Sequence, residues 1–226
     1  HSSGISYPFV KNDLQKVYRK AGIISGATSK EMYLKDQMQK LATLPLLFEP
    51  GSKFQYGLNI DLLGYLCEVI SGRSLDEFFS EEIFLPLQMH DTYFYIPEQD
   101  HDRLVTLYSW VDGKGLAVSK GDESAIKMDN PNYPVEGSGT YFSGGAGLSS
   151  TTYDYARFIQ MLLNKGRLEG VRILSRKSVK LMRRGRIDSN DDGEPDIGFG
   201  FSIINDIAEA GELGSDGSYS WGGAFN

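Results

Sequence analysis

Apolar side chains recur at helical spacing along much of this chain, and glycines or capping residues mark where the periodic stretches end. The most apolar stretch runs from Leu58 to Ile70 and stops at Gly72, so it predicts a helix buried in the core. The same spacing, with Ser, Thr or Gly at the ends, predicts further helices over 12–21, 28–44, 74–86, 151–165 and 175–184.

Alternation of apolar with small or polar residues appears only late in the chain. Residues 197–204 alternate as a strand does, residues 217–221 begin a second strand, and their polar connection suits an antiparallel hairpin. Residues 129–147 hold too few apolar side chains for a core and are typical of a long loop lining a cleft. Helices first and strands last favour an α+β fold. We expect a mainly helical lobe over 1–165, followed by a helix and the first strands of an antiparallel sheet over 166–226.

Composition narrows the class of protein. The chain has 226 residues, of which 40% are hydrophobic and 23% charged, as is ordinary for a globular domain. A net charge of −7 argues against a nucleic-acid surface, which needs clustered basic side chains. The single Cys67 excludes an internal disulfide and a cysteine-based zinc site. No run of about 18 apolar residues is present, so we expect no membrane span in this chain.

The stretch before the most apolar helix carries the leading candidate for chemistry. A Pro50-Gly51 turn and a short aromatic segment lead to Tyr56, just ahead of the helix. Backbone N–H groups and the positive end of the helix dipole favour an anion there. A phenol has a pKa near 10, so it acts as a base only where cations and N–H donors stabilise the phenolate. Tyr56 is therefore a candidate catalytic residue, and the alternative is an aromatic ring packed under the helix start.

Several motifs resemble one family in the same order along the chain. Residues 49–64 resemble the tyrosine box of serine β-lactamase-like proteins, which include class C β-lactamases, DD-peptidases and esterases of the same fold. Residues 142–151 are similar to the family's Gly-rich turn, and residues 220–224 to its third box, Lys-Thr-Gly in other members. Residues 85–92 and the opening His-Ser-Ser-Gly also fit. The resemblance implies a β-lactamase/transpeptidase-like fold.

The resemblance also implies a mechanism and roles for particular residues. In the family a serine attacks an acyl carbon, a lysine and a tyrosine move its proton, and two backbone N–H groups hold the oxyanion. In this sequence Tyr56 stands at the position of the family's catalytic tyrosine. One oxyanion donor comes from the third-box strand, which points to Ala224, after Trp221, Gly222 and Gly223. The resemblance implies neither a metal nor another cofactor.

Two departures from the family pattern concern the substrate. Trp221 stands where many members have Lys or His, a cation that would pair with a penicillin or peptide carboxylate. An indole offers one N–H donor and an apolar face, which favours neutral, apolar acyl groups, unless Trp221 only packs its strand. Asn59 comes three positions after Tyr56, whereas the family pattern is Tyr-x-Asn. Asn59 is either an amide on the substrate side or a helix N-cap.

The nucleophile is expected outside this chain. Its Ser-x-x-Lys pattern, Ser124 to Lys127, follows the tyrosine box in a polar stretch, and such a short pattern arises easily by chance. The family places its serine upstream of the His-x-Ser-Gly stretch, with which this chain opens. We therefore expect a chain cut at both ends, with the catalytic Ser and Lys before His1, and no activity from these 226 residues alone.

Other catalytic patterns are weaker. There is no Gly-x-Ser-x-Gly elbow, and the three histidines, His1, His90 and His101, lie in no triad-like context and are interpreted as structural or surface residues. Residues 188–193 match the first half of a calcium loop, but Phe199 occupies the position of the bidentate Glu. A solvated acidic turn is the better interpretation of that segment.

The sequence thus predicts a serine hydrolase acting through an acyl-enzyme on a small-molecule ester, amide or peptide. The resemblance favours a periplasmic or secreted location and leaves the oligomeric state open. A true β-lactamase or DD-peptidase is the enzymatic alternative, disfavoured by Trp221. A catalytically inactive homologue that binds cell-wall peptides is the alternative from another class.

Overall fold

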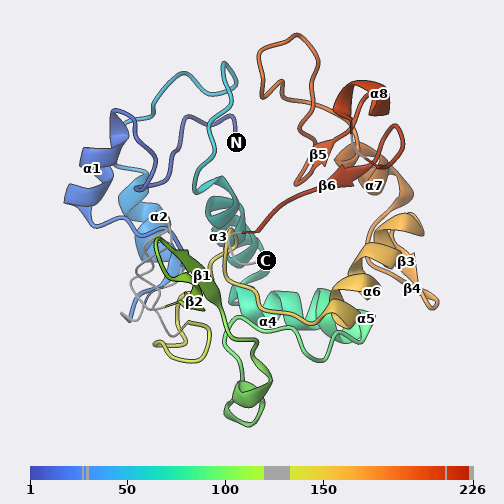
Figure 1. Cartoon of the computed structure of the whole chain (residues 1–226), viewed down its shortest axis with the longest axis horizontal. Coiled ribbons are helices and arrows are strands. Elements are labelled where there is room, and N and C mark those ends of the chain that lie inside the picture. Colours follow the sequence, from blue (N-terminus) through green and yellow to red (C-terminus); the bar gives the residue numbers. More distant parts are fainter. Residues whose placement is uncertain (27, 29–30, 120–132, 212, 224–226) are drawn as a thin grey trace.

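The helix α3 (Asn59–Ser71) lies between the two sides of the molecule in the computed structural model, seen in Figure 1. The structure describes residues 1–26, 28, 31–119, 133–211 and 213–223. Helices α1 and α2 lie on one side of α3, and α6 and α7 on the other. The helical elements besides α3 are α1 (Leu14–Ala21), α2 (Leu34–Leu41), α4 (Leu75–Phe79), a π-helical turn (Ser80–Phe84), α5 (Leu85–Leu87), a 3₁₀ turn (Glu98–Arg103), α6 (Thr152–Leu163), α7 (Arg176–Met182) and α8 (Ile207–Ala210).

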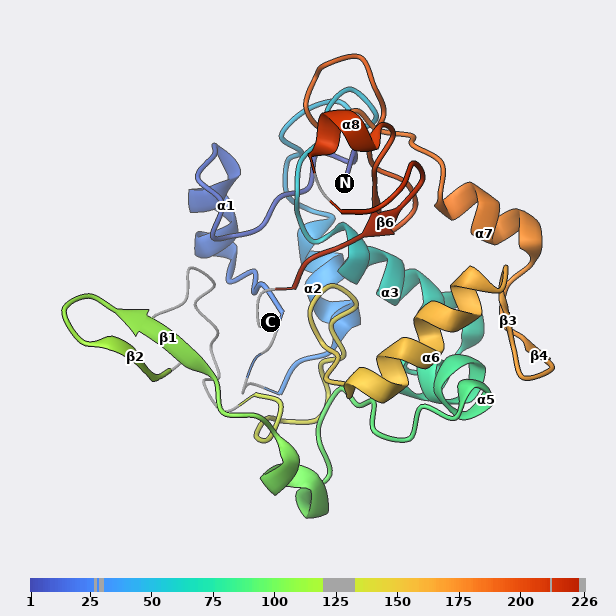
Figure 2. The same ribbon diagram turned by 45° about the vertical axis from the view of Figure 1, so that its right-hand side comes forward.

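The strands of the described residues form three separate antiparallel pairs, visible in Figures 1 and 2. These pairs are β1 (Tyr108–Val111) with β2 (Gly115–Val118), β3 (Arg167–Leu168) with β4 (Val171–Arg172), and β5 (Ser202–Ile203) with β6 (Tyr219–Ser220). The predicted antiparallel pairing of the two late strands is confirmed, with Ile203 opposite Tyr219. Their regular parts are shorter than predicted, and α8 lies in the connection. The α+β class is confirmed.

Buried apolar side chains form two clusters. The first cluster joins the opening segment and helices α1 to α4 to Phe94 and Tyr141. The second cluster joins the π-helical turn and α5 to helices α6 and α7. Full burial of each large apolar side chain contributes roughly 1.5–3 kcal/mol, so each cluster stabilises its part of the molecule. The second cluster contains residues from both sides of position 165, and the division of the chain there remains a prediction.

Local capping explains several helix ends. Helices α1 and α3 end at Gly22 and Gly72, whose φ angles of 68° and 70° are left-handed. The Ser74–Glu77 capping box begins α4 as predicted. The predicted start of a helix at Thr28 is wrong, because α2 begins only at Leu34. The backbone of Met32 instead exchanges two hydrogen bonds with the Thr140 hydroxyl, which holds that segment outside the helix.

The expectation of a fully buried α3 is also wrong. The helix buries Asn59, Asp61 and Gly64, whereas Leu63 and Ile70 are 53% and 77% exposed. Apolar residues occur around the whole helix, so their spacing did not reveal which face is covered. Close contacts with small or polar residues decide the orientation: a Cβ at Gly64 would lie 2.8 Å from Cδ2 of Leu75. None of the described helices combines the length and apolarity needed to cross a membrane.

The segment before α6 also contributes more to the core than its composition predicts. Residues 133–147 have no helix or strand, as expected, yet Tyr141 is buried in the first cluster. The Tyr141 hydroxyl accepts a 2.6 Å hydrogen bond from Nε2 of Gln37. Gln37 is itself buried and exchanges hydrogen bonds with the backbone N–H and C=O of Ile24. A polar network therefore fixes this segment against α2, which apolar counting alone missed.

Candidate active site

Three segments far apart in sequence meet around His1. Its ring lies 4.8 Å from the Tyr56 ring, centroid to centroid, and is stacked on Trp221 at 6.0 Å. The Tyr56 and Trp221 rings are 6.1 Å apart. One site is thus formed by residues of the opening segment, of the tyrosine box and of the last described segment of the chain.

Backbone contacts place Tyr56 just before α3. The N–H of Gln55 donates to the carbonyl oxygen of His1 at 2.7 Å, and Leu58 is completely buried. Gly57 passes so close to the Ile5 carbonyl that a side chain there would clash with backbone. These anchors leave Tyr56 38% exposed, three residues before the first helical residue, Asn59. The predicted placement of the phenol beside a helix start is observed.

Asn59 faces His1 and does not cap the helix. The N-cap residue of α3 is Leu58, so the interpretation of Asn59 as an N-cap is wrong. Its Oδ1 accepts a 2.5 Å hydrogen bond from the Ser3 hydroxyl, and its Nδ2 lies 3.0 Å from Nδ1 of His1. An amide NH₂ can only donate, so Nδ1 of His1 is the acceptor and the ring proton is on Nε2.

Trp221 follows β6, which is anchored in the second cluster. The Tyr219 ring packs edge-on against Phe201 at 4.9 Å, and Trp221, two residues on, reaches the site with 42% of its side chain exposed. A Cβ at Gly222 would meet nothing within 4 Å, so the backbone beyond Trp221 is open on that side. Gly223 is exposed as well.

Two polar side chains lie behind Tyr56. The Tyr7 ring is buried and stands 5.1 Å from the Tyr56 ring. Burial, then the negative charge of Asp61, then Tyr56 itself, raise the pKa of the Tyr7 phenol above its usual value. Burial likewise raises the pKa of Asp61 to about 6, against a lowering by the hydrogen bond from the Ser143 hydroxyl. That bond, to Oδ1 of Asp61, is 2.6 Å long.

Sequence comparison identifies the family. The profile of the Beta-lactamase family matches residues 1–226, the whole of this chain. The chain belongs to the beta-lactamase family. Its predicted membership and its β-lactamase/transpeptidase-like fold are therefore confirmed.

Several relatives within the beta-lactamase family are similar along the entire chain. An uncharacterized protein of Mycobacterium tuberculosis is 30% identical over 239 residues, which cover 100% of this chain and 55% of that protein. Esterase EstB of Burkholderia gladioli is 29% identical over 235 residues, covering 100% of this chain and 58% of EstB. The chain therefore spans little more than half the length of these curated relatives.

Solved structures give the same fold. EstCE1, a hydrolase with promiscuous acyltransferase activity, is 26% identical, with a TM-score of 0.78 over 99% of this chain and 59% of EstCE1. Simvastatin synthase of Aspergillus terreus, a LovD6 mutant, is 22% identical, with a TM-score of 0.69 over 99% of this chain and 53% of its own. The second likeness concerns the fold alone.

The structure brings together some of the predicted residues of this beta-lactamase-family chain and leaves others apart. Tyr56, Asn59 and Trp221 converge, and Gly222 and Gly223 continue from Trp221. Ala224 and the segment 124–127 lie outside the described residues. Their predicted roles remain predictions.

Sequence reasoning missed three side chains of this site. The sequence predicts a structural or surface role for His1, although it opens the His-Ser-Ser-Gly stretch that fits the family pattern. His101 does have a structural contact, with Nε2 2.9 Å from the Ile96 carbonyl oxygen. Tyr7 and Asp61 were also missed. An acidic residue in the first turn of a largely apolar helix is a signal for Asp61, because such a side chain is rarely buried without a reason.

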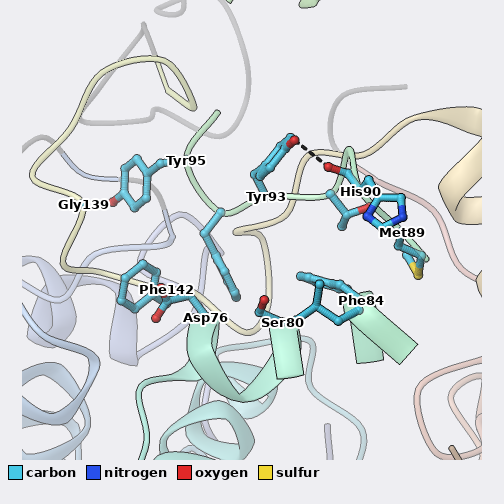
Figure 3. A pocket seen from close by; sticks show the side chains of 12 residues that line it. Asp76, Ser80, Phe84, Met89, His90, Tyr93, Tyr95, Gly139 and Phe142 are labelled. Atoms are coloured by element: carbon cyan, nitrogen blue, oxygen red, sulfur yellow. Dashed lines mark hydrogen bonds between the residues drawn. The ribbon is translucent and has the colours of Figure 1, made fainter. Parts of the chain in front are cut away.

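A separate cavity lies away from this site. It has a volume of about 460 Å³ and is lined by aromatic rings together with polar side chains that include Asp76, Ser80 and His90, as Figure 3 shows. The Tyr93 hydroxyl donates to the carbonyl oxygen of His90 beside it. Tyr56 does not line this cavity, so the candidate chemistry is assigned to the cluster of rings around His1.

Metal ligands do not gather anywhere in the described part of the chain: no group of three His, Cys, Asp or Glu side chains is close enough to hold an ion. In the acidic turn, the Asp188 carboxylate accepts hydrogen bonds from the N–H groups of Asp191 and Gly193, both at 2.7 Å. Four such backbone N–H bonds, the strongest from Gly193, hold the pKa of Asp188 below its usual value. These contacts favour the interpretation as a solvated acidic turn.

Proposed function

We propose that this protein is a serine hydrolase that acts on an ester or amide through an acyl-enzyme, with Tyr56 in the general-base role. The observation that carries the proposal is the meeting of a half-exposed phenol and an indole, 6.1 Å apart, at the start of α3. A phenol at this place can accept the proton of an attacking hydroxyl, provided that cations and N–H donors stabilise its phenolate.

The proposal requires a nucleophile from the longer protein. The curated relatives extend well beyond the matched region, and a catalytic serine and lysine preceding His1 would complete the site. The lysine ammonium would supply the cation that the phenolate needs. Under this proposal the 226 residues by themselves form no acyl-enzyme.

The substrate side of the site favours a neutral acyl group. Trp221 presents an apolar face and a single N–H donor, and no cation stands in its place to bind a carboxylate. Gly222, Gly223 and Ala224 follow Trp221 in the sequence, and an N–H group of this segment is proposed to donate to the oxyanion. Asn59 contacts His1 in the same cluster and is proposed to contact the substrate. The names of EstB and of a lovastatin esterase among the relatives support an ester as the substrate.

The test compares the full-length protein with its Tyr56→Phe variant on a short-chain nitrophenyl ester and a chromogenic cephalosporin. We expect ester turnover and a loss in kcat/KM of about 100-fold or more in the variant, the size typical of removing a general base. Tyr108→Phe, which alters an exposed tyrosine on β1, is the matched control and retains activity.

Other outcomes would replace the proposal. Preference for the cephalosporin points to a β-lactamase. No turnover of either substrate supports a binding protein instead. Full activity in a folded Tyr56→Phe variant removes Tyr56 from the general-base role. A serine-directed fluorophosphonate gives a second measure: it labels the full-length protein and leaves residues 1–226 unlabelled, and labelling of the short chain would contradict the upstream nucleophile.

A further inference from the structure

The positive charge of this chain is concentrated in one short segment. Residues 165–186 hold nine of the 23 Lys and Arg residues and one of the 30 Asp and Glu residues, so the segment has a net charge of +8 in a chain whose total is −7. All nine basic residues are exposed, and together they are called the basic surface: Lys165, Arg167, Arg172, Arg176, Lys177, Lys180, Arg183, Arg184 and Arg186.

The fold gathers the basic surface at one outer edge of the molecule. The hairpin β3–β4 and the helix α7 lie at the same edge in both views (Figures 1 and 2). Arg172 of the hairpin and Arg176 and Lys177 of the helix border one surface hollow of about 430 Å³. Arg176 and Lys180, four positions apart, share the face of α7 that lies opposite the buried Val179. The cations of the hairpin and of the helix therefore form one surface.

Carbonyl oxygens and an aromatic ring orient the arginines of the basic surface. Nη1 of Arg172 donates to the carbonyl oxygens of Lys165 and Leu174, at 3.1 Å and 2.9 Å. The guanidinium carbon of Arg183 lies 4.8 Å from the centre of the Tyr219 ring. Neither kind of partner carries a full negative charge, so the positive charges are fixed in place without being neutralised.

No carboxylate of the described residues neutralises the basic surface either. None of its nine side chains forms an ion pair with a described Asp or Glu. Glu169, the acid of this segment, is paired with Arg157 of α6, where Oε2 lies 2.6 Å from Nη2. Cations that are already oriented and have no acidic partner can bind an anion with a smaller loss of side-chain freedom. The surface is therefore suited to a large anionic partner.

Apolar side chains are exposed among these cations. Val171 on β4 is 39% exposed, Leu181 on α7 is 44% exposed, and Leu163 at the end of α6 is 55% exposed. Basic residues interspersed with exposed apolar residues are typical of surfaces that lie on a bilayer, because the cations meet anionic headgroups and the apolar side chains enter the layer beneath. A nucleic acid offers the negative charge but no such apolar layer.

We propose that the basic surface, formed by β3–β4 and α7, binds the headgroups of a bilayer that contains anionic phospholipids. The remainder of the chain is acidic, so such a bilayer repels it and only the basic surface faces the lipid. This inference does not depend on the proposed function, since none of the nine residues belongs to the site around His1.

The experiment measures sedimentation of the full-length protein with lipid vesicles. We expect binding to vesicles of phosphatidylcholine and phosphatidylglycerol in equal amounts and no binding to vesicles of phosphatidylcholine alone. Raising NaCl from about 0.1 M to about 0.5 M should release the protein, because salt screens the charges. The triple variant Arg176→Gln, Lys177→Gln and Lys180→Gln should bind about 100-fold more weakly, since each cation near an anionic lipid surface strengthens binding about fivefold.

A second triple variant is the matched control. Lys16→Gln, Lys20→Gln and Lys40→Gln remove three exposed lysines from α1 and α2, on the other side of α3, and should leave vesicle binding within about twofold of wild type. Equal losses in the two triple variants would show that only the net charge matters and would overturn the inference. Failure of the folded wild type to bind the phosphatidylglycerol vesicles would overturn it too.

Two apolar substitutions distinguish a bilayer from a soluble polyanion. Val171→Ser combined with Leu181→Ser keeps every charge and should weaken vesicle binding about tenfold, with no change in binding to duplex DNA. Tighter binding of the wild type to DNA than to vesicles at the same salt concentration, or unchanged vesicle binding by the double variant, would exclude a bilayer as the partner. Circular dichroism checks that each variant is folded, and the salt dependence of the wild type tests the charge contribution without any substitution.

Discussion

On one face of α3, Asp61 and Gly64 are buried, whereas on the other face Leu63 and Ile70 are 53% and 77% exposed. The covered face is held by close backbone approach and by a hydrogen bond to Ser143, 82 positions away in the sequence. The exposed face has apolar side chains with no cover from the described residues. The comparison shows that the helix is oriented by its small and polar residues, which are the ones that adjoin the candidate site.

The largest expected effect comes from removing the titratable carboxyl group of Asp61 from the covered face of α3. Burial raises the pKa of Asp61 to about 6, from 3.8 in the unfolded chain. The folded state therefore holds the proton more tightly, and this stability contribution is present below pH 3.8 and is lost as the pH rises through 6. Asp61→Asn has no such proton, so its stability relative to wild type should rise by about 3 kcal/mol between pH 3 and pH 8. Urea unfolding of both proteins across this range measures the difference, and a difference independent of pH would contradict the expectation.

A smaller effect is expected from adding a side chain to a glycine of the segment that packs against the same face. A Cβ at Gly144 would lie 2.6 Å from the carbonyl oxygen of Ile60, a backbone atom that cannot rotate away. Gly144→Ala should lower the free energy of unfolding by about 1–3 kcal/mol, as overpacking does. The control is Gly222→Ala, which should leave the free energy of unfolding unchanged because a Cβ at Gly222 meets open space. Gly139→Ala is unsuitable as a control because the φ of Gly139 is +68°.

The smallest effect is expected on the exposed face. Ile70 makes few contacts in the described chain, so Ile70→Ala should change the free energy of unfolding by less than about 0.5 kcal/mol. Denaturant unfolding of residues 1–226 and of the full-length protein would sharpen the comparison. Removing a buried Ile side chain lowers the free energy of unfolding by about 2 kcal/mol or more. If Ile70→Ala caused such a loss in the longer protein alone, another part of that protein would cover this face.

The sequence predicted what depends on local chemistry. Gly22, Gly72, Ser74, Thr151 and Ser175 mark helix ends because their effects act within one turn. Local patterns could not predict contacts between distant residues. The bond between Gln37 and Tyr141 spans 104 positions, and the two hydrogen bonds of Thr140 with Met32 span 108.

The candidate site shows the same limit. Motif order identified Tyr56 and Trp221, because each stands in a short segment of recognisable composition. His1, Tyr7 and Asp61 enter the site through ring contacts and burial that no short pattern records. The sequence therefore reveals the groups that resemble known chemistry more readily than the groups that pack around them.

The amide of Asn59 couples the protonation of His1 to the hydrogen bonds of neighbouring residues. With Nδ2 directed at Nδ1 of His1, the ring must remain unprotonated at that nitrogen. Protonation would set two donors against each other and turn the amide over, reversing its bond with the Ser3 hydroxyl, which also accepts from the N–H of Ile5. One proton on the imidazole would thus reverse the bond between Asn59 and Ser3, while the N–H of Ile5 still donates to the Ser3 hydroxyl.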